Sequence, residues 1–316
     1  MTDRIGVLAM AYGTASGPED VERYYTDIRG GRTPSPELLE ELKERYAAIG
    51  NRFPLLEITR AQASALEREL ELEEPGRFKV YLGMKHSPPF IRQGVEEMRA
   101  DEIRRAVGLV LAPHYSRLSI GTYIDRVNAA VGESDGESPA GPAFTFIESW
   151  HDHPLFIEAV ADRVEEALSK LPSGEREGAT VVFTAHSLPA KILAEGDPYP
   201  AQLQETADLV AKKLGLSSYR TGWQSAGRTP EPWLGPDLGE IIRDVAAAGH
   251  PAMVVCACGF VADHLEILYD LDIEAQHEAQ EAGITLVRTR SMNDAPDFVA
   301  ALAAVVREHV GGSVQG

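Results

Sequence analysis

Residues 252–274 read AMVVCACGFVADHLEILYDLDIE, and the fold class can be predicted from their pattern. The run 252–258 is apolar enough for a buried strand, and the glycine that follows it marks the turn at the strand's end. A helical pattern then begins at His264 and continues to residue 282. A strand, a glycine turn and a helix in succession predict an α/β fold built on parallel sheets.

A histidine and three carboxylates in this helix suggest metal or proton chemistry. His264 and Glu266 follow the strand, and Asp270 and Glu274 continue on one side of the helix at intervals of four residues. An imidazole beside a carboxylate suits a divalent first-row metal or a proton relay. A solvated acidic face explains the outer two acids equally well. It explains poorly why His264 and Glu266 lie at the end of a strand.

The same alternation of strands and helices extends along the whole chain. Apolar runs predict strands at 5–11, 78–82, 107–112, 143–147, 180–185, 219–222, 252–258 and 284–288. Strands this apolar predict parallel sheets covered on both faces. The expected fold class is therefore α/β, with four strand–helix units in each half of the chain.

A length of 316 residues fits two domains of average size. The Gly/Ser/Pro-rich stretch Gly132–Pro142 predicts an exposed loop, with a domain junction soon after it. We expect an N-terminal domain over 1–150 and a C-terminal domain over 151–293. The last helix, at 294–310, is expected to complete the N-terminal domain.

Composition excludes several classes of protein. The net charge of −19 opposes a nucleic-acid role, and 44% hydrophobic with 25% charged residues is typical of a folded soluble protein. No apolar run reaches the length of about 18 residues that a transmembrane helix needs. The N-terminal residues lack the pattern of a signal peptide, so a cytoplasmic protein is expected.

Chemically active side chains follow six of the expected strands. Ligands of open α/β sheets bind outside the carboxyl ends of the strands, so these side chains predict a cleft between the two halves. They lie in the segments Tyr12–Thr14, Lys85–His86, Pro113–Ser116, His186–Pro189, Trp223–Ser225 and Gly259–Glu266. The sequence fingerprints of dinucleotide sites, P-loops, zincins and hydrolase elbows are absent.

A set of longer motifs extends along the chain. They are HSLP at 186–189, GDPYP at 196–200, WQS at 223–225, PWLGP at 232–236, GFVADHLE at 259–266, MAYGT at 10–14, ERYYTDIRGGR at 22–32 and APHYS at 112–116. The first five together resemble the ferrochelatase family, and the last three resemble its bacterial branch that metallates coproporphyrin III. The resemblance implies a type II chelatase fold, with two Rossmann-like domains and a porphyrin cleft between them.

The resemblance also implies roles for individual residues. His186 matches the family's cleft histidine and Glu266 its partner acid, so both are expected to act in catalysis and to contact the metal. Tyr12 matches the tyrosine that ligates the product iron from the other porphyrin face. The other expected substrate-binding residues are Arg29, Arg45, Tyr46, Phe53, Lys85 and Tyr123. Phe53 stands where relatives carry a serine, so a hydroxyl contact to a propionate is lost there.

Iron insertion explains why such residues are needed. Fe²⁺ must lose water, the flat ring must bend, and two pyrrole protons must leave. A neutral imidazole can accept a proton or ligate the metal, and a nearby carboxylate makes it more basic. His186 with Glu266 is therefore expected to accept protons or to handle the metal, and the sequence leaves these two roles open. Asp270 and Glu274 form either a hydrated route for cations or a wet helix face.

Substrate choice depends on the segment 29–53, which corresponds to the membrane-contacting lip of protoporphyrin chelatases. It is strongly charged here and unsuited to a bilayer. Its four arginines suit carboxylates, of which coproporphyrin III carries four and protoporphyrin two, although Arg32 and Arg52 are explained equally well as ordinary surface residues. The expected reaction is insertion of Fe²⁺ into coproporphyrin III in haem b biosynthesis. A protoporphyrin IX ferrochelatase, a cobalt or nickel chelatase and a non-catalytic haem carrier remain the alternatives.

The expected partners are porphyrin and ferrous iron, with a transient contact to the downstream coprohaem decarboxylase. We expect a monomer that binds no nucleic acid and does not insert into a membrane. Some relatives carry a [2Fe–2S] cluster, but Cys256 and Cys258 cannot supply four thiolates, so no cofactor beyond the substrate Fe²⁺ is expected. These cysteines are expected to be small strand residues that face the core. HDH at 151–153 suggests metal in isolation, but the proline that follows favours a solvated helix start.

Overall fold

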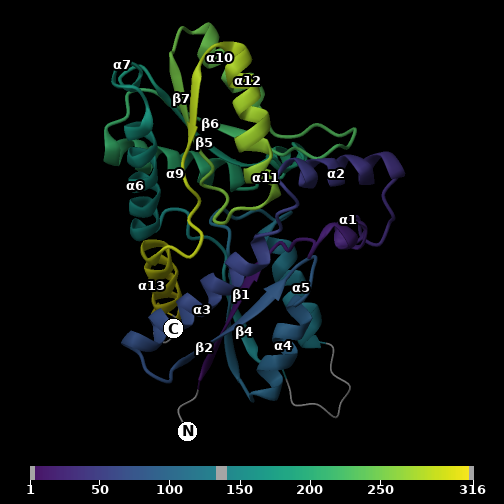
Figure 1. The fold of residues 1–316 in the computed structure, drawn as a ribbon. Coiled ribbons are helices and arrows are strands. Elements are labelled where there is room, and N and C mark those ends of the chain that lie inside the picture. The colour runs from purple at the N-terminus through teal and green to yellow at the C-terminus, as the bar shows by residue number, and fades with distance from the viewer. Residues whose placement is uncertain (1–3, 133–140, 313–316) are drawn as a thin grey trace. The chain divides into compact units, whose positions relative to one another are not determined.

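The computed structural model divides into two compact units (Figure 1). It describes residues 4–132 and 141–312, so most of the expected loop Gly132–Pro142 lies outside the described residues. Unit 1 comprises Met1–Ala112, Arg117–Trp150 and Asn293–Gly316, and unit 2 comprises Pro113–Ser116 and His151–Met292.

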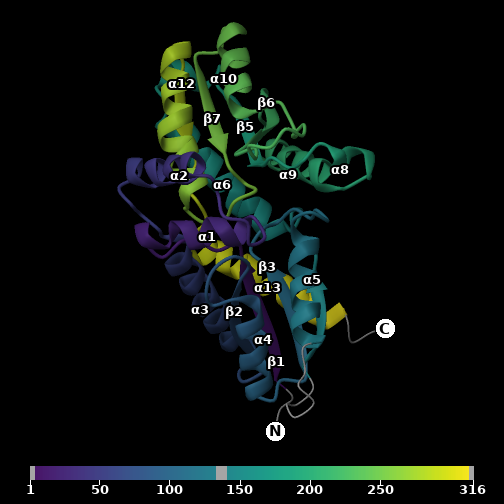
Figure 2. The same ribbon diagram turned by 90° about the vertical axis from the view of Figure 1, so that its right-hand side faces the viewer.

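Unit 1 is built on a parallel four-stranded sheet in the order β2-β1-β3-β4. Its strands are β1 (Ile5–Ala11), β2 (Phe78–Met84), β3 (Arg105–Val110) and β4 (Ala143–Ile147). Its helices are α1 (Val21–Ile28), α2 (Pro36–Ala48), α3 (Leu55–Glu73), α4 (Ile91–Ala100), α5 (Ile120–Gly132) and α13 (Pro296–Gly312). Every residue of β1 is buried, which explains why that strand is continuously apolar. The helices pack as the pairs α3–α13 and α4–α5 (Figure 2).

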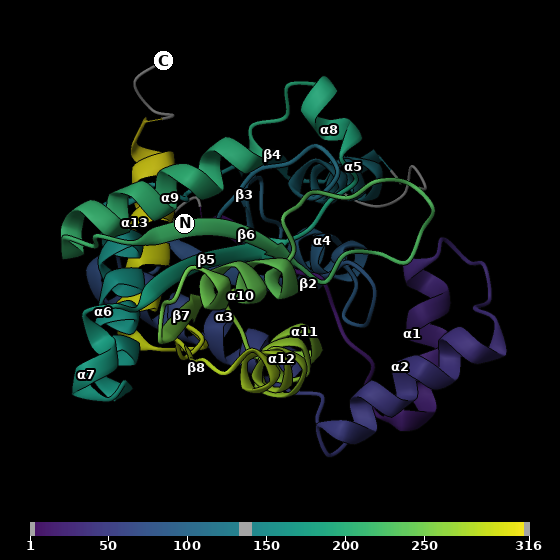
Figure 3. The same cartoon turned by 90° about the horizontal axis from the view of Figure 1, so that it is seen from above.

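Unit 2 repeats this plan with the strand order β6-β5-β7-β8, again all parallel. Its strands are β5 (Thr180–His186), β6 (Tyr219–Gln224), β7 (Ala252–Cys256) and β8 (Thr285–Arg288). Its helices are α6 (Pro154–Lys170), α7 (Ser173–Arg176), α8 (Lys191–Ala194), α9 (Tyr199–Leu214), α10 (Leu238–Ala247), α11 (Leu265–Leu268) and α12 (Ala275–Ala282). Helix α6 packs beside α9, and α10 packs beside α12 (Figure 3). The two sheets confirm the expected α/β fold.

The apolar core of unit 2 explains how its strands and helices hold together. Val182, Met253 and Val255 from the strands pack against Ile241 and Leu271 from the helical layer, all of them fully buried. Burying such side chains stabilises the fold by about 1.5–3 kcal/mol each. Along the described residues, no helix combines the length and the apolar character that crossing a membrane requires.

The turn after β7 brings the chain close to β5. The backbone N–H of Gly259 donates to the oxygen of Thr184 at 3.0 Å, and a Cβ at position 259 would overlap Ala185. Only glycine permits so close an approach between backbones. This glycine therefore places the segment that leads to Glu266 beside the strand that ends in His186.

The expected helix from His264 to residue 282 is helical over 265–282 but is not a regular α-helix throughout. Between α11 and α12 lies a π-helix at Asp270–Glu274, in which the N–H of Glu274 donates to the oxygen of Tyr269 at 3.0 Å. This wider turn places the acids differently from an α-helix, because a π turn spans five residues. The prediction of a regular line of acids at four-residue intervals is therefore wrong.

Candidate active site

His186 is the last residue of β5, at the carboxyl edge of the unit 2 sheet. Its Nδ1 donates to the backbone oxygen of Ser187, which can only accept a hydrogen bond. The neutral imidazole therefore carries its proton on Nδ1 and presents a lone pair on Nε2. The hydroxyl of Tyr199 donates to the backbone oxygen of His186 at 3.0 Å and so holds this residue in place.

Glu266 lies in the first turn of α11 and faces two imidazoles. Its Oε1 is 3.7 Å from Nε2 of His186, and its Oε2 is 3.7 Å from Nε2 of His264. The side chains of His186 and Glu266 are 34% and 30% exposed. Both distances exceed an ordinary hydrogen bond, so the pair is close enough for strong electrostatic interaction but is not closed by a direct bond. The structure thus brings together the two residues that we expected to act in catalysis.

His264 supports Glu266 from the buried side of the site. Its Nδ1 donates to the backbone oxygen of Ala262 at 2.8 Å, which directs Nε2 toward the carboxylate. Burial opposes the charged imidazole, but the interaction with the Glu266 carboxylate and the hydrogen bond to the Ala262 carbonyl outweigh it and raise the pKa of His264.

The acids beyond Glu266 differ in their surroundings. Asp270 is only 6% exposed and accepts a hydrogen bond from the hydroxyl of Ser225. The interpretation of a solvated helix face is therefore wrong for Asp270. Asp272 accepts from the Arg288 guanidinium at 2.9 Å, whereas Glu274 is exposed, as a wet helix face requires.

Three of the expected substrate-binding residues of unit 1 lie together. Tyr12 follows β1 and is 42% exposed. The Lys85 ammonium is 5.7 Å from the ring centroid of Tyr12 and 5.0 Å from that of Tyr123. It donates to the Thr122 hydroxyl at 2.6 Å. Burial and, to a smaller extent, Arg126 lower the pKa of Lys85 to about 8.

A second imidazole–carboxylate pair lies in unit 1. Nδ1 of His86 is 2.6 Å from Oδ1 of Asp27, and the ring centroids of His86 and Tyr12 are 4.6 Å apart. Burial lowers the pKa of His86 to about 4, although the hydrogen bond to Asp27 acts in the opposite direction. Sequence reasoning noticed His86 at a strand end but missed Asp27, because no local pattern links residues 59 positions apart.

The remaining expected residues of unit 1 lie on and around α1 and α2. The rings of Tyr46 and Phe53 stack with centroids 4.4 Å apart, and Tyr46 also lines a pocket of about 290 Å³. Arg29 follows the last residue of α1, with its guanidinium 5.7 Å from the Tyr25 ring centroid. Arg45 lies in the last turn of α2.

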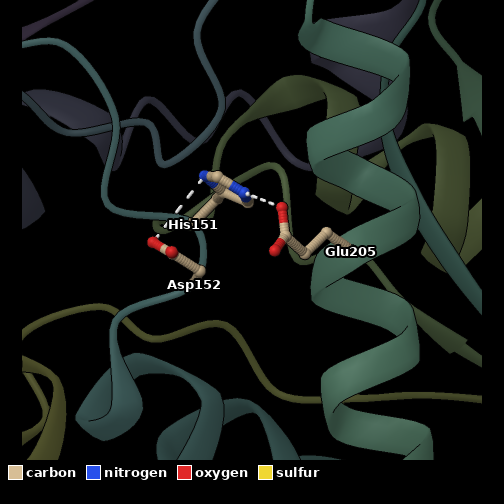
Figure 4. Close-up of side chains that lie close together, drawn as sticks. All are labelled: His151, Asp152 and Glu205. Carbon is tan, nitrogen blue, oxygen red and sulfur yellow. Dashed lines mark hydrogen bonds and ion pairs between the residues drawn. The ribbon is translucent and has the colours of Figure 1, made fainter.

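The HDH segment is more ordered than a solvated helix start. His151 is 7% exposed, so that expectation is wrong for its side chain. Nε2 of His151 is 3.0 Å from Oε2 of Glu205, and Nδ1 is 4.0 Å from Oδ1 of Asp152 (Figure 4). The two carboxylates thus approach opposite nitrogens of one ring, and both are more than half exposed. The imidazole links the start of α6 to α9. One ligand atom of each of these three residues lies within 4.8 Å of the others, so the group has the spacing that a metal ion could use.

Both cysteines are buried and free, as expected of core residues, but β7 ends at Cys256, so the prediction that Cys258 is a strand residue is wrong, and Cys258 lies in the turn that follows. Sγ of Cys258 lies 3.9 Å from the backbone oxygen of Thr184. A hydrogen bond to Cys256 and burial raise the pKa of Cys258, so this thiol stays protonated near neutral pH.

Solved structures define the class of protein. The chelatase SirB from Bacillus subtilis with Fe³⁺ aligns over 99% of this chain and 98% of its own, with a TM-score of 0.59 at 13% identity. SirB from Bacillus subtilis subspecies spizizenii in complex with cobalt aligns over 96% of this chain and 94% of its own, with a TM-score of 0.54 at 12% identity. At this identity the likeness concerns the fold alone, and that fold is the type II chelatase fold.

Sequence relatives define the family. The family model described as Ferrochelatase matches residues 4–310. The coproporphyrin III ferrochelatase of Geobacillus sp. (strain WCH70) is 48% identical over 97% of this chain and 98% of its own length. That of Bacillus subtilis (strain 168) is 47% identical over 98% of each chain. The ferrochelatase of Thermus thermophilus is 47% identical over 96% of this chain and 98% of its own. The chain belongs to the ferrochelatase family.

Proposed function

We propose that this enzyme inserts Fe²⁺ into coproporphyrin III to give coprohaem, with release of two protons, in haem b biosynthesis. Relatives that carry the name coproporphyrin III ferrochelatase support the reaction, at 47–48% identity over nearly the whole chain. The single observation that carries the chemistry is the placement of His186 Nε2 at 3.7 Å from Glu266 Oε1, where both side chains remain partly exposed.

His186 is the proton acceptor in this proposal. Because Nδ1 donates to the Ser187 carbonyl, the lone pair of Nε2 is the one available to a reactant. A pyrrole N–H gives its proton to Nε2, and the nitrogen keeps the electron pair with which it binds Fe²⁺. Glu266 stabilises the imidazolium that forms, through its negative charge at 3.7 Å. General-base catalysis of this kind contributes about 10²–10⁴ in rate.

Two protons leave for each iron inserted, so His186 must pass on the first before it accepts the second. Glu266 is the nearest acceptor, at 3.7 Å from Nε2, and His264 faces its other oxygen. In the alternative role, Nε2 of His186 and the Glu266 carboxylate ligate the incoming Fe²⁺ before transfer. Imidazole nitrogen and carboxylate oxygen are both suitable ligands for this metal.

Unit 1 supplies the proposed substrate-binding residues. Tyr12 is partly exposed and ligates the product iron through its phenolic oxygen. The Lys85 ammonium and the guanidinium groups of Arg29 and Arg45 bind propionates, since cations and forked donors suit carboxylates. Tyr123 is fully buried against Lys85, where it orients the ammonium.

Phe53 takes a different role from the hydroxyl that it replaces. Its ring stacks on Tyr46 at 4.4 Å, so the two aromatic side chains act as one apolar surface. We propose that the partly exposed Phe53 packs against the edge of the macrocycle, and that Tyr46, which is 3% exposed with its hydroxyl 3.5 Å from Oγ1 of Thr14, supports the Phe53 ring from below.

The proposal needs no cofactor beyond the Fe²⁺ that is consumed, and no [2Fe–2S] cluster. Porphyrin and ferrous iron are the substrates of a monomer in the cytoplasm. A transient contact with the coprohaem decarboxylase that consumes the product completes the proposed set of partners.

An anaerobic insertion assay tests this function. Purified protein is mixed with Fe²⁺ and either coproporphyrin III or protoporphyrin IX, and metallation is followed by absorbance. We expect kcat/KM for coproporphyrin III to exceed that for protoporphyrin IX about 10-fold or more, because two further carboxylates can pair with cations. A preference for protoporphyrin IX would overturn the substrate assignment, and no metallation of either would overturn the activity.

A further inference from the structure

Gln224 ends β6 beside His186, and its side-chain amide bridges two parts of unit 2. It is 4% exposed and pairs with His186 in the strand register. Its Oε1 accepts a hydrogen bond from the hydroxyl of Thr184 at 2.8 Å. Its Nε2 donates to the backbone oxygen of Glu266 at 3.0 Å. One side chain therefore connects the strand that ends in His186 to the residue that carries the carboxylate.

The backbone oxygen of Glu266 determines which way the amide of Gln224 points, because a carbonyl oxygen can only accept a hydrogen bond. A flipped amide would place two oxygens, from Gln224 and from Glu266, against each other with no proton between them. The amide oxygen therefore faces Thr184, whose fully buried hydroxyl donates to it and anchors the amide to β5.

The backbone of Glu266 needs support of this kind. It lies in the first turn of the helical segment that begins with α11 and continues through the π-helix Asp270–Glu274. The first turn of a helix is held by few hydrogen bonds of its own, because its N–H groups have no partners within the helix. The chain between β7 and α11 contains no regular secondary structure.

We infer that Gln224 is a positioning residue for iron insertion, which holds Glu266 at the working distance from Nε2 of His186. This role rests on the proposed function. Without the bridge, the backbone at Glu266 is free to move away from β5, and the 3.7 Å separation is no longer maintained. A displacement of about 1 Å in a catalytic group can reduce a rate about 100-fold.

The kinetics of variants at positions 184 and 224 test the role. Gln224→Leu removes both hydrogen bonds, and Thr184→Val removes the one that anchors the amide to β5. We expect kcat for iron insertion to fall about 50-fold in Gln224→Leu and about 10-fold in Thr184→Val, with KM for coproporphyrin III within about 2-fold of wild type. Thr184→Ser keeps the hydroxyl and should restore kcat to within about 2-fold of wild type.

Thr180→Val is the matched control. Thr180 lies at the opposite end of β5, is equally buried, and its hydroxyl bonds that of Ser218 at 3.0 Å. The variant Thr180→Val therefore loses a side-chain hydrogen bond from the same strand, at the end away from His186. Its kcat should match that of wild type even where its melting temperature falls as far as that of Thr184→Val.

The double variant Thr184→Val with Gln224→Leu completes a double-mutant cycle for the bridge. Because both changes break one bridge, its kcat should equal that of Gln224→Leu alone rather than fall by the product of the two losses. The role is overturned if Thr184→Val and Thr180→Val lose kcat equally, or if both retain wild-type kcat. If Gln224→Leu does not fold, the comparison of Val and Ser at position 184 decides by itself. A wild-type protein that inserts no iron would instead contradict the proposed function, and this role with it.

Discussion

The two imidazole–carboxylate pairs contain the same chemical groups in opposite settings. In unit 2, Nε2 of His186 and Oε1 of Glu266 are 3.7 Å apart, and the side chains are 34% and 30% exposed. In unit 1, Nδ1 of His86 and Oδ1 of Asp27 are 2.6 Å apart, and the side chains are 7% and 34% exposed. Both histidines lie at the ends of parallel strands, so position in the fold does not distinguish them.

The difference shows what makes a histidine available for chemistry. A short, partly buried hydrogen bond holds the imidazole of His86 against its carboxylate, and burial of the ring keeps it neutral. Such a pair suits a structural role, in which it supports the ring of Tyr12 beside it. An open pair that no direct hydrogen bond closes leaves the Nε2 lone pair of His186 free to accept a proton or ligate a metal.

Removing the charge of each carboxylate in turn should give the largest difference in kcat between the two pairs. Glu266→Gln leaves the imidazolium of His186 without its counter-charge, so we expect kcat to fall about 100-fold while porphyrin still binds. Asp27→Asn should lower kcat less than about 5-fold but cost about 1–3 kcal/mol of unfolding free energy, because a buried charge-assisted bond is lost. Steady-state kinetics and denaturant unfolding measure the two effects. Similar kcat losses in both variants would remove the distinction.

The free energy of unfolding at acidic pH tests the His86–Asp27 pair of unit 1. The pKa of His86 is about 4 in the folded protein against an ordinary value of 6.5. The unfolded chain therefore takes up a proton at a pH where the folded one does not. The contribution of His86 to stability is complete above pH 6.5 and is lost as the pH falls toward 4, by on the order of 3 kcal/mol in total. Denaturant unfolding at several pH values should give a flatter curve for His86→Gln, and parallel curves would argue against a buried neutral imidazole.

Substrate binding near Lys85 should give a smaller effect. Lys85→Met removes the ammonium and keeps the length of the side chain, so we expect the Kd for coproporphyrin III to rise about 5–10-fold at pH 7. Wild-type affinity should weaken as the pH rises through 8, where Lys85 loses its charge, and the variant should lack this change. Fluorescence titrations compare it with Lys212→Met, an exposed lysine in the last turn of α9. Equal effects of the two substitutions would exclude a specific role for Lys85.

Much of the fold follows from local sequence pattern. The eight apolar runs correspond to the eight strands of the described residues. The central strands β1, β5 and β7 are buried on both faces and must therefore be apolar, whereas the edge strands β4 and β6 are partly exposed. The motif at His186 was predictable for the same reason, since His186 ends such a strand, and the motif at Glu266 follows the glycine turn after β7. Helix boundaries were less predictable, as the π-helix at Asp270–Glu274 shows. Its wider turn depends on tertiary contacts such as that between Asp270 and Ser225, which helical periodicity cannot reveal.

Partners far apart in the chain also escaped prediction. Asp27 lies in α1, and His86 lies just after β2. Thr184, Gln224 and Glu266 come from three separate segments of the chain. In the sequence alone, each of these residues could equally be an ordinary surface or strand residue. Their burial and hydrogen bonds indicate their roles, and these depend on the order of the strands in each sheet.

Single-turnover iron insertion by His186→Ala tests the central claim most directly. The matched control is His277→Ala on α12, since His277 faces Glu281 at 3.8 Å in a fully solvated pair. We predict that His186→Ala binds coproporphyrin III but inserts Fe²⁺ at least about 100-fold more slowly, whereas His277→Ala behaves as wild type. Wild-type insertion by His186→Ala would contradict the assignment of His186 as the residue that accepts the pyrrole protons or delivers the metal.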